Sequence, residues 1–361
     1  MTLLLFVAGL GLLVLGANLL VRGASGLALA LGISPLAVGL TVVAFGTSAP
    51  EVAVSVGAAL SGRTDIATGN VVGSNIFNVL AILGVSALIV PLSVDRQLIR
   101  QEVPIMIGAS VLLLALGADG RVGWIEGAML FALLVAYTAF LLLQSRRETR
   151  AARSGVAEPA TAGAPVARGW GASLPAQIGL VVAGLAALVL GSDWLVTAAV
   201  AFAKALGVSD LVIGLTIVAA GTSMPEVATS ISAALKGERD IAVGNVIGSN
   251  TFNILGCLGL SALVSGPQGL AVAPALLAFD IWVMLAVALA CLPVFVTGRE
   301  IARWEGAVFL FYYAAYAAYL VLAAQQHDAL AAFSTAMMSF VVPITVVTLI
   351  VLLFGRSAYQ R

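Results

Sequence analysis

The chain has 361 residues, of which 61% are hydrophobic and only 9% are charged, and its formal net charge is +0. Soluble globular domains are typically about 45–50% apolar and about 25% charged. The composition therefore excludes an ordinary soluble enzyme, a disordered chain and a nucleic-acid-binding protein. It indicates a polytopic membrane protein, because each membrane-spanning helix needs roughly 20 apolar residues. Two cysteines and one histidine also exclude a disulfide framework and a site built on histidine or cysteine clusters.

Apolar stretches bounded by glycine, proline or charged residues predict eleven helices. They cover residues 2–21, 33–60, 67–90, 98–117, 122–143, 173–197, 209–235, 241–265, 272–297, 302–324 and 332–354. Residues 144–172 are rich in Arg, Ala, Gly and Pro and predict a flexible linker. If this linker is cytoplasmic, alternation of the loops places 14 of the 17 basic residues inside, as the positive-inside rule requires. We therefore expect a multi-pass protein of the cell membrane, with the N-terminus outside, the C-terminus in the cytoplasm and no obligatory protein partner.

The two halves of the chain repeat each other at a shift of 175 residues. Residues 46–84 and 221–259 are identical at 26 of 39 aligned positions. Each repeat holds five predicted helices, and because five is odd, the second repeat enters the membrane from the opposite side. Inverted repeats are common among secondary transporters. The sequence therefore predicts an all-α membrane protein with a ten-helix core of two inverted repeats, 1–143 and 173–324, while 325–361 adds an eleventh helix outside the repeat.

Each repeat interrupts its second helix with a short polar motif, GTSAPE at 46–51 and GTSMPE at 221–226. Glycine and proline break the helix, and the backbone carbonyls freed in this way are good ligands for a hard cation. The hydroxyls and carboxylates of both motifs add further oxygens, from Thr47, Ser48, Glu51, Thr222, Ser223 and Glu226. Ser48-x-x-Glu51 also fits a capping box at the start of a half-helix. A carboxylate inside an apolar span is costly, however, and usually marks an ion pathway.

The third helix of each repeat carries a second polar motif, GNVVGSNIFN at 69–78 and GNVIGSNTFN at 244–253. Helical spacing aligns the first Asn, the Ser and the last Asn of each motif on one face. The glycines fit close helix packing, and the outermost Asn70 and Asn245 fit packing as well as an ion site. The predicted ion ligands are Ser74, Asn78, Ser249 and Asn253, whose hydroxyl and amide oxygens bind Ca²⁺ or Na⁺ without adding charge.

Inversion of the repeats would bring the two broken helices together near the membrane midplane. Ca²⁺ takes six to eight oxygen ligands in flexible geometry, whereas Mg²⁺ resists full dehydration. One Ca²⁺ would neutralise Glu51 and Glu226. Without a cation the two carboxylates repel each other, which makes the empty site costly and favours exchange over uniport.

These paired motifs closely resemble the two α-repeats of the calcium:cation antiporter superfamily, in its prokaryotic sodium/calcium exchanger branch. The resemblance covers the ten-helix core, residues 2–324 without the linker. It implies that Na⁺ entry drives Ca²⁺ out by alternating access, as the first and sixth helices slide across the remaining bundle. It implies that both repeats bind the transported ions through the side chains of Thr47, Ser48, Glu51, Ser74, Asn78, Thr222, Ser223, Glu226, Ser249 and Asn253 and the backbone carbonyls of Ala44 and Ala219. No cofactor is implied, because Na⁺ and Ca²⁺ are the substrates.

Asn253 differs from several relatives, since potassium-dependent members carry Asp at the matching position, and this argues against potassium co-transport. A proton/calcium antiporter that uses the same site is the closest alternative function, and only the driving ion separates the two. An ion channel is disfavoured by the inverted repeat and by the cost of an empty site. An intramembrane enzyme is disfavoured because the only paired acids lie in cation-ligand motifs and no Ser/His or two-histidine arrangement accompanies them.

Overall fold

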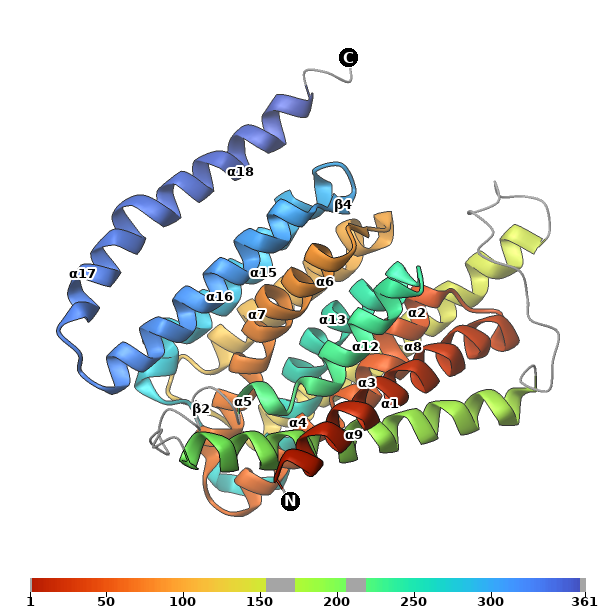
Figure 1. Ribbon diagram of the computed structural model, residues 1–361, viewed down its shortest axis with the longest axis horizontal. Coiled ribbons are helices and arrows are strands. Elements are labelled where there is room, and N and C mark those ends of the chain that lie inside the picture. Colours follow the sequence, from red (N-terminus) through yellow and green to blue (C-terminus); the bar gives the residue numbers. More distant parts are fainter. Residues whose placement is uncertain (1, 154–172, 206–218, 358–361) are drawn as a thin grey trace.

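The computed structural model describes residues 2–153, 173–205 and 219–357, which are almost entirely helical (Figure 1). The elements of the first half are α1 (Thr2–Leu31), α2 (Pro35–Val38), η1 (Gly39–Val43), α3 (Ala44–Thr47), α4 (Ala49–Leu60), α5 (Thr64–Phe77), η2 (Asn78–Leu83), α6 (Gly84–Ile89), β1 (Leu92–Ser93), η3 (Leu98–Glu102), α7 (Val103–Leu116), β2 (Arg121–Val122) and α8 (Trp124–Arg153). Those of the second half are α9 (Leu174–Ala205), α11 (Ala219–Gly221), α12 (Met224–Leu235), α13 (Arg239–Phe252), η6 (Asn253–Leu258), α14 (Gly259–Val264), η7 (Gly266–Gln268), β3 (Leu270–Ala271), η8 (Leu276–Asp280), α15 (Ile281–Val296), β4 (Glu300–Ile301), α16 (Arg303–Ala324), α17 (Ala329–Ala336), η9 (Met337–Val341) and α18 (Val342–Ser357).

The described helices lie where the spans are predicted, but α1 continues to Leu31 and α9 to Ala205, past their predicted ends at residues 21 and 197. Nine are long and apolar enough to cross a membrane, and the bent pair Pro35–Thr47 and Ala49–Leu60 makes a tenth. The seventh predicted helix, 209–235, lies partly outside the described residues, and its described part consists of α11 and α12. Helix α8 runs to Arg153, past its predicted end at residue 143, so the predicted linker begins later than expected. The rest of that linker, 154–172, lies outside the described residues.

The third helix of each repeat, α5–α6 in the first and α13–α14 in the second, lies at the centre of the bundle. In the most apolar windows of α5–α6 and α13–α14, 78% and 89% of the residues are buried, against at most 39% in the other described spans. These helices carry the polar motifs, and polar side chains at membrane depth need protein around them rather than lipid. A π-helical segment begins at Asn78 in one repeat and at Asn253 in the other. Such irregular turns inside helices frequently occur at functional sites.

The first helices of the two repeats, α1 and α9, lie side by side along one flank of the bundle (Figure 1). Glycines spaced seven residues apart bring the two backbones together. A Cβ at Gly16 would lie 2.7 Å from the carbonyl oxygen of Gly184, and a Cβ at Gly191 would lie 2.8 Å from that of Gly9. Any larger side chain at these positions would force the helices apart, so the two helices pack as one unit.

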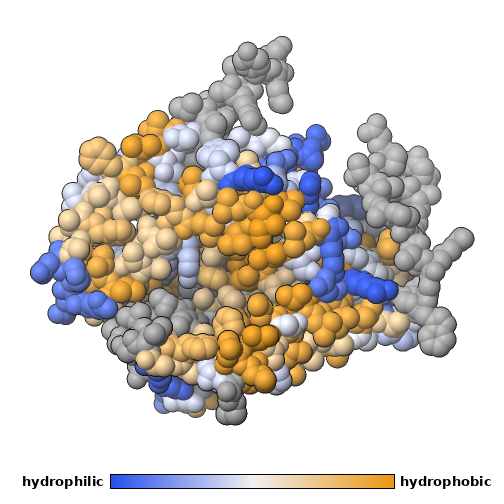
Figure 2. All heavy atoms as spheres, in the orientation of Figure 1, coloured by the Kyte–Doolittle hydropathy of each residue, from blue (hydrophilic) through white to orange (hydrophobic). Residues whose placement is uncertain are grey.

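Two short β-ladders show which loops share an end of the bundle. β1 pairs with β4 and β2 pairs with β3, both antiparallel. The loops after the third and ninth predicted helices therefore meet at one end, and those after the fourth and eighth meet at the other. This is the arrangement that alternation of eleven spans requires. Apolar residues cover much of the outer surface (Figure 2), as expected where lipid is the solvent.

The last helices, α17 and α18, lie at the periphery, beside α15 and α16 (Figure 1). No residue in the most apolar window of Ala329–Thr348 is buried. The hydroxyl of Tyr312 donates to the carbonyl of Val341 at 3.3 Å and is one polar tie to the core. The eleventh helix is thus an addition to the ten-helix core, as predicted from its place outside the repeat.

Candidate functional site: a buried cluster of oxygens between the repeats

Each GTSxPE motif lies at a break in its helix. Ser48 separates α3 from α4 with φ −78° and ψ 7°, and the span bends there by 45°. Ser223, with φ −87° and ψ 10°, precedes α12 in the second repeat. Pro50 and Pro225 occupy the first turn of the helix that follows, where a missing N–H costs nothing. The breaks therefore arise from the local sequence, as the motifs predicted.

The two breaks face each other across the boundary between the repeats. The hydroxyl of Ser48 donates to Glu226 Oε1 at 3.1 Å, and the hydroxyl of Ser223 donates to Glu51 Oε1 at 2.7 Å. Both carboxylates are 0% exposed. The capping box expected from Ser48 and Glu51 was a wrong prediction, because the Ser48 side chain caps no backbone N–H of α4. The hydroxyl instead bonds to the glutamate of the other repeat, where it lowers the cost of burying that carboxylate.

Seven buried oxygens around these carboxylates take part in no hydrogen bond of good geometry with any described residue. They are Glu51 Oε2, Ser74 Oγ, Asn78 Oδ1, Thr222 Oγ1, Glu226 Oε2, Ser249 Oγ and Asn253 Oδ1. All seven belong to residues that the sequence predicts as ion ligands. An unsatisfied buried polar atom costs about 1–3 kcal/mol, and native proteins contain few of them. They come from both repeats and from the helices that carry the two polar motifs, which makes these residues candidates for a site where a cation supplies the missing interaction.

The remaining predicted ligands lie beside this cluster. The hydroxyl of Thr47 donates to Asn245 Oδ1 at 3.1 Å, across the boundary between the repeats. The carbonyl of Ala44, the first residue of α3, accepts the N–H of Ser48 at 3.0 Å and lies 3.4 Å from the hydroxyl oxygen of Thr47. Ala219 is the first residue of α11. The hydroxyls of Thr222 and Ser249 lie close enough to Glu51 and Glu226 to interact with their carboxylates.

Asn70 and Asn245, for which packing and ligation were both open, hold their own repeats together. Asn70 Nδ2 donates to Ser55 Oγ at 2.9 Å, and Asn245 Nδ2 donates to Ser230 Oγ at 3.0 Å. These bonds tie the third helix of each repeat to the second, close to the glutamate. Ser55 and Ser230 were not singled out in the sequence, although their equivalent places in the two repeats could have drawn attention to them.

The charge of the cluster is set by two carboxylates alone. Glu51 and Glu226 are near enough to repel each other. Within the part of the chain that the structure describes, there is no group of three or more His, Cys, Asp or Glu residues. Cys257, also missed by the sequence analysis, approaches the carbonyl oxygen of Glu51 at 3.3 Å and is buried. The cluster therefore suits a hard divalent cation held by two charges and several neutral oxygens.

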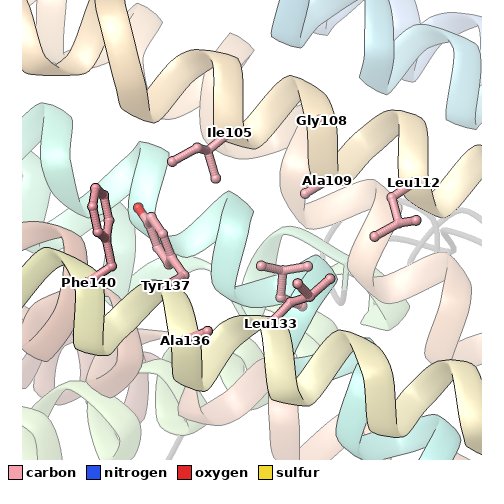
Figure 3. A pocket seen from close by; sticks show the side chains of 9 residues that line it. Ile105, Gly108, Ala109, Leu112, Leu133, Ala136, Tyr137 and Phe140 are labelled. Atoms are coloured by element: carbon pink, nitrogen blue, oxygen red, sulfur yellow. The ribbon is translucent and has the colours of Figure 1, made fainter.

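An apolar groove lies apart from this cluster, between α7 and α8 (Figure 3). Its volume is about 410 Å³, and its lining is almost entirely aliphatic and aromatic, with Tyr137 as the polar exception. The Tyr137 hydroxyl donates to Glu102 Oε2 at 2.6 Å, and two glutamine amides donate to Glu102 Oε1. Glu102 is 0% exposed, and its carboxylate accepts these three hydrogen bonds. This third buried glutamate is therefore structural and lies outside the candidate ion site.

Two inverted five-helix repeats around a buried, oxygen-lined site are the architecture of a secondary transporter. The family model described as "Sodium/calcium exchanger protein" matches residues 1–143 and 176–322. The chain belongs to this family, and both the family and the fold are those of cation/Ca²⁺ antiporters.

Named relatives and solved structures agree with this assignment. The chain is 39% identical over 280 residues to the putative antiporter CaxA of Alkalimonas amylolytica, covering 75% of this chain and 83% of that protein. It is 36% identical over 301 residues to the sodium/calcium exchanger MaX1 of Methanosarcina acetivorans, covering 75% and 84%. A solved structure of the sodium-calcium exchanger NCX_Mj matches with a TM-score of 0.72 and 30% identity, covering 86% of this chain and 96% of that one.

Proposed function

We propose that the protein is a sodium/calcium antiporter that moves Ca²⁺ out of the cell in exchange for Na⁺. The observation that carries this proposal is the set of seven buried, unpartnered oxygens that both repeats contribute around two carboxylates. Six to eight oxygens in flexible geometry are what Ca²⁺ requires, and two glutamates neutralise its charge. The proposed ion ligands are Glu51, Glu226, Thr47, Ser48, Thr222, Ser223, Ser74, Asn78, Ser249, Asn253 and the carbonyls of Ala44 and Ala219.

The balance between the two glutamate charges and one Ca²⁺ favours exchange of Ca²⁺ for other cations over release that leaves the site empty. Removing a divalent cation from the site would leave two carboxylates that repel each other in a buried place, which is expensive. The protein can avoid this state by admitting other cations as Ca²⁺ leaves. Two relatives named as sodium/calcium exchangers, MaX1 and NCX_Mj, support Na⁺ as that cation. The name of the putative antiporter CaxA states no driving ion, so the test must include protons.

Alternating access needs a part of the protein that moves past the site. We assign this motion to α1 and α9, whose glycine contacts make them a single packed unit. Few hydrogen bonds between described residues join α1 to α12 and its C-cap. Lys236 Nζ donates to the carbonyl of Asn18 at 3.0 Å, and Ser232 Oγ donates to Asn18 Oδ1 at 3.4 Å. We place the chain in the cell membrane with the N-terminus outside and the C-terminus in the cytoplasm, as the distribution of basic residues indicates.

Radiocalcium uptake into proteoliposomes tests the function directly. Vesicles are loaded with Na⁺, with K⁺ or with acidic choline buffer and are diluted into medium that contains ⁴⁵Ca²⁺. A sodium/calcium antiporter takes up Ca²⁺ only into the Na⁺-loaded vesicles. Uptake driven by an acidic interior without Na⁺ would make the protein a proton/calcium antiporter. Uptake that needs no counter-ion would contradict antiport altogether.

The variant Glu51→Gln serves as the negative control for the site, and Glu102→Gln is its matched control. Both residues are buried glutamates, but only Glu51 lies in the oxygen cluster. Uptake should disappear in Glu51→Gln and persist in Glu102→Gln. Equal loss in both variants would indicate that the transport assay reports folding rather than ion binding.

A further inference from the structure

Four asparagines form a hydrogen-bonded chain at the centre of the bundle, where the third helices of the two repeats cross, in the order Asn78, Asn250, Asn75 and Asn253. Asn78 Nδ2 donates to Asn250 Oδ1 at 2.9 Å, and Asn253 Nδ2 donates to Asn75 Oδ1 at 3.1 Å. Asn75 and Asn250 in turn donate to each other's backbone carbonyl, at 3.2 and 3.3 Å. All four side chains are buried, with at most 2% exposed. Asn75 and Asn250 are not among the proposed ion ligands.

The backbone carbonyls of Asn75 and Asn250 determine which way each of the four amides points. A carbonyl oxygen only accepts, so the atom of Asn75 that faces the Asn250 carbonyl must be its NH₂ group. The other atom of the Asn75 amide is then the oxygen, which only accepts. Asn253 must therefore turn its own NH₂ group toward Asn75, and this leaves Asn253 Oδ1 on the opposite side. In the same way, the NH₂ group of Asn250 must face the Asn75 carbonyl, so Asn250 turns its oxygen toward Asn78. Asn78 therefore donates its NH₂ group to Asn250, which leaves Asn78 Oδ1 free.

The NH₂ groups of Asn75 and Asn250 are further occupied by sulfur. Asn75 Nδ2 lies 3.7 Å from the sulfur of Met284, and Asn250 Nδ2 lies 3.5 Å from the sulfur of Met106. Each NH₂ group has two hydrogens, one for the carbonyl and one for the thioether, which is a weak acceptor. No hydrogen of these two amides is left to rotate toward another partner. The amides of Asn75 and Asn250 are thus fixed in a single orientation.

The two oxygens that this chain of asparagines leaves free at its ends, Asn78 Oδ1 and Asn253 Oδ1, belong to the seven unpartnered oxygens of the candidate site. A cation is attracted by an amide oxygen and repelled by an amide NH₂ group. From this geometry we propose that Asn75 and Asn250 are positioning residues, each of which forces the ligand asparagine of the other repeat to present its oxygen to the transported cation. The inference rests on the proposed function, because it assigns to these residues the orientation of two of its ligands.

The test variant is Asn250→Leu, which keeps the approximate volume but removes both the donor and the acceptor. Without Asn250 Oδ1 the amide of Asn78 is free to turn its NH₂ group toward the cation. We expect the Kd for Ca²⁺ to rise by about tenfold or more, the range seen when groups that orient metal ligands are removed. Asn75→Leu removes the acceptor of the Asn253 amide and so frees Asn253 to turn its NH₂ group toward the cation. It serves as the second variant should Asn250→Leu fail to fold.

Making Asn250→Leu also in the Asn78→Asp variant separates an effect on the orientation of residue 78 from an effect on helix packing. In Asn78→Asp the carboxylate has two oxygens, so either orientation of the side chain presents an oxygen to the cation. The other carboxylate oxygen, however, now faces the acceptor Asn250 Oδ1 and is repelled by it. Adding Asn250→Leu removes that repulsion. We therefore expect Asn250→Leu to weaken Ca²⁺ binding in the native background and to leave it unchanged or improve it in the Asn78→Asp background. A purely structural role of Asn250 would weaken binding in both.

The experiment is titration of the purified full-length protein in detergent with Ca²⁺ alone, by calorimetry, with thermal unfolding of each variant recorded alongside. The matched control is Thr251→Val, since among the described residues the Thr251 hydroxyl bonds only to the Ile247 carbonyl of its own helix, at 3.2 Å. The equivalent residue of the first repeat is Ile76, so an apolar side chain fits there. The control should bind Ca²⁺ with the native Kd.

The outcomes distinguish the two proposals. If the native protein binds no Ca²⁺, the proposed function fails, and this inference fails with it. If the native protein binds Ca²⁺ and Asn250→Leu binds it with the same Kd, the proposed function stands and the positioning role is refuted. Equal weakening by Asn250→Leu in both backgrounds also refutes it. Weakening confined to the native background supports it.

Discussion

Replacing Glu51 by Gln removes one of the two charges of the candidate site and keeps nearly the same shape. Glu51 is 0% exposed, its Oε1 accepts from Ser223, and its Oε2 has no partner among the described residues. An amide can keep the bond from Ser223 through its own oxygen. The variant therefore isolates the effect of charge from the effect of packing.

The magnitude follows from electrostatics. Two unit charges about 4 Å apart attract by about 4 kcal/mol at an effective dielectric constant of about 20, and the divalent ion doubles this to about 8 kcal/mol. Even half of that value corresponds to about a thousandfold in affinity, because each 1.4 kcal/mol is tenfold. At a Ca²⁺ concentration a hundred times the native Kd, bound ion stabilises the native protein by about 2.7 kcal/mol. After a thousandfold loss of affinity, the same concentration stabilises the variant by less than about 0.1 kcal/mol.

The assay is thermal unfolding in detergent, with a chelator and with Ca²⁺. Glu51→Gln should show no increase in Tm with Ca²⁺. Its cation-free Tm should equal or exceed that of the native protein, because the variant lacks an unpaired buried carboxylate and its repulsion from Glu226.

Glu102→Gln should behave in the opposite way. Its carboxylate accepts three hydrogen bonds from side chains, so an amide NH₂ there faces a donor, and each buried group left unsatisfied costs about 1–3 kcal/mol. Its Tm should fall while the Ca²⁺-induced increase remains. A Glu51→Gln protein that Ca²⁺ still stabilises as strongly as the native one would refute the assignment of the site.

Three other changes test separate parts of the structure. Gly184→Ala places a Cβ 2.6 Å from the backbone nitrogen of Leu20 and should destabilise the protein by about 1–3 kcal/mol, whereas Gly179→Ala, with open space around it, should leave the Tm unchanged. Ser223→Ala removes the hydroxyl from Glu51 and should raise the Kd for Ca²⁺ about tenfold in calorimetry, and an unchanged Kd would exclude it as a ligand. Deletion of residues 325–361, which lie beyond the family match, should leave Na⁺-driven ⁴⁵Ca²⁺ uptake intact.

Local sequence was sufficient to predict much of this protein. Apolar length determines where a helix can span the membrane, and ten spans were located from it. The 175-residue repeat with an odd number of helices implied inversion. Glycine and proline placed the breaks at Ser48 and Ser223, and polar residues inside apolar spans indicated which side chains to propose as ion ligands. All of these signals are carried by neighbours in the chain, and a single sequence contains them.

Only the tertiary structure decided which groups meet across the repeats. The sequence motif around Ser48 fits a capping box equally well, and the choice of Glu226 as its partner depends on a residue 178 positions away. Asn75 and Asn250 each lie one step round the helix from a predicted ligand, and their role depends on a backbone carbonyl of the other repeat. The close approach of α1 and α9 likewise depends on glycines that have no local signature. Hydrogen bonds and steric contacts between distant segments act only once the chain is folded, so the pattern of residues along one segment cannot specify them.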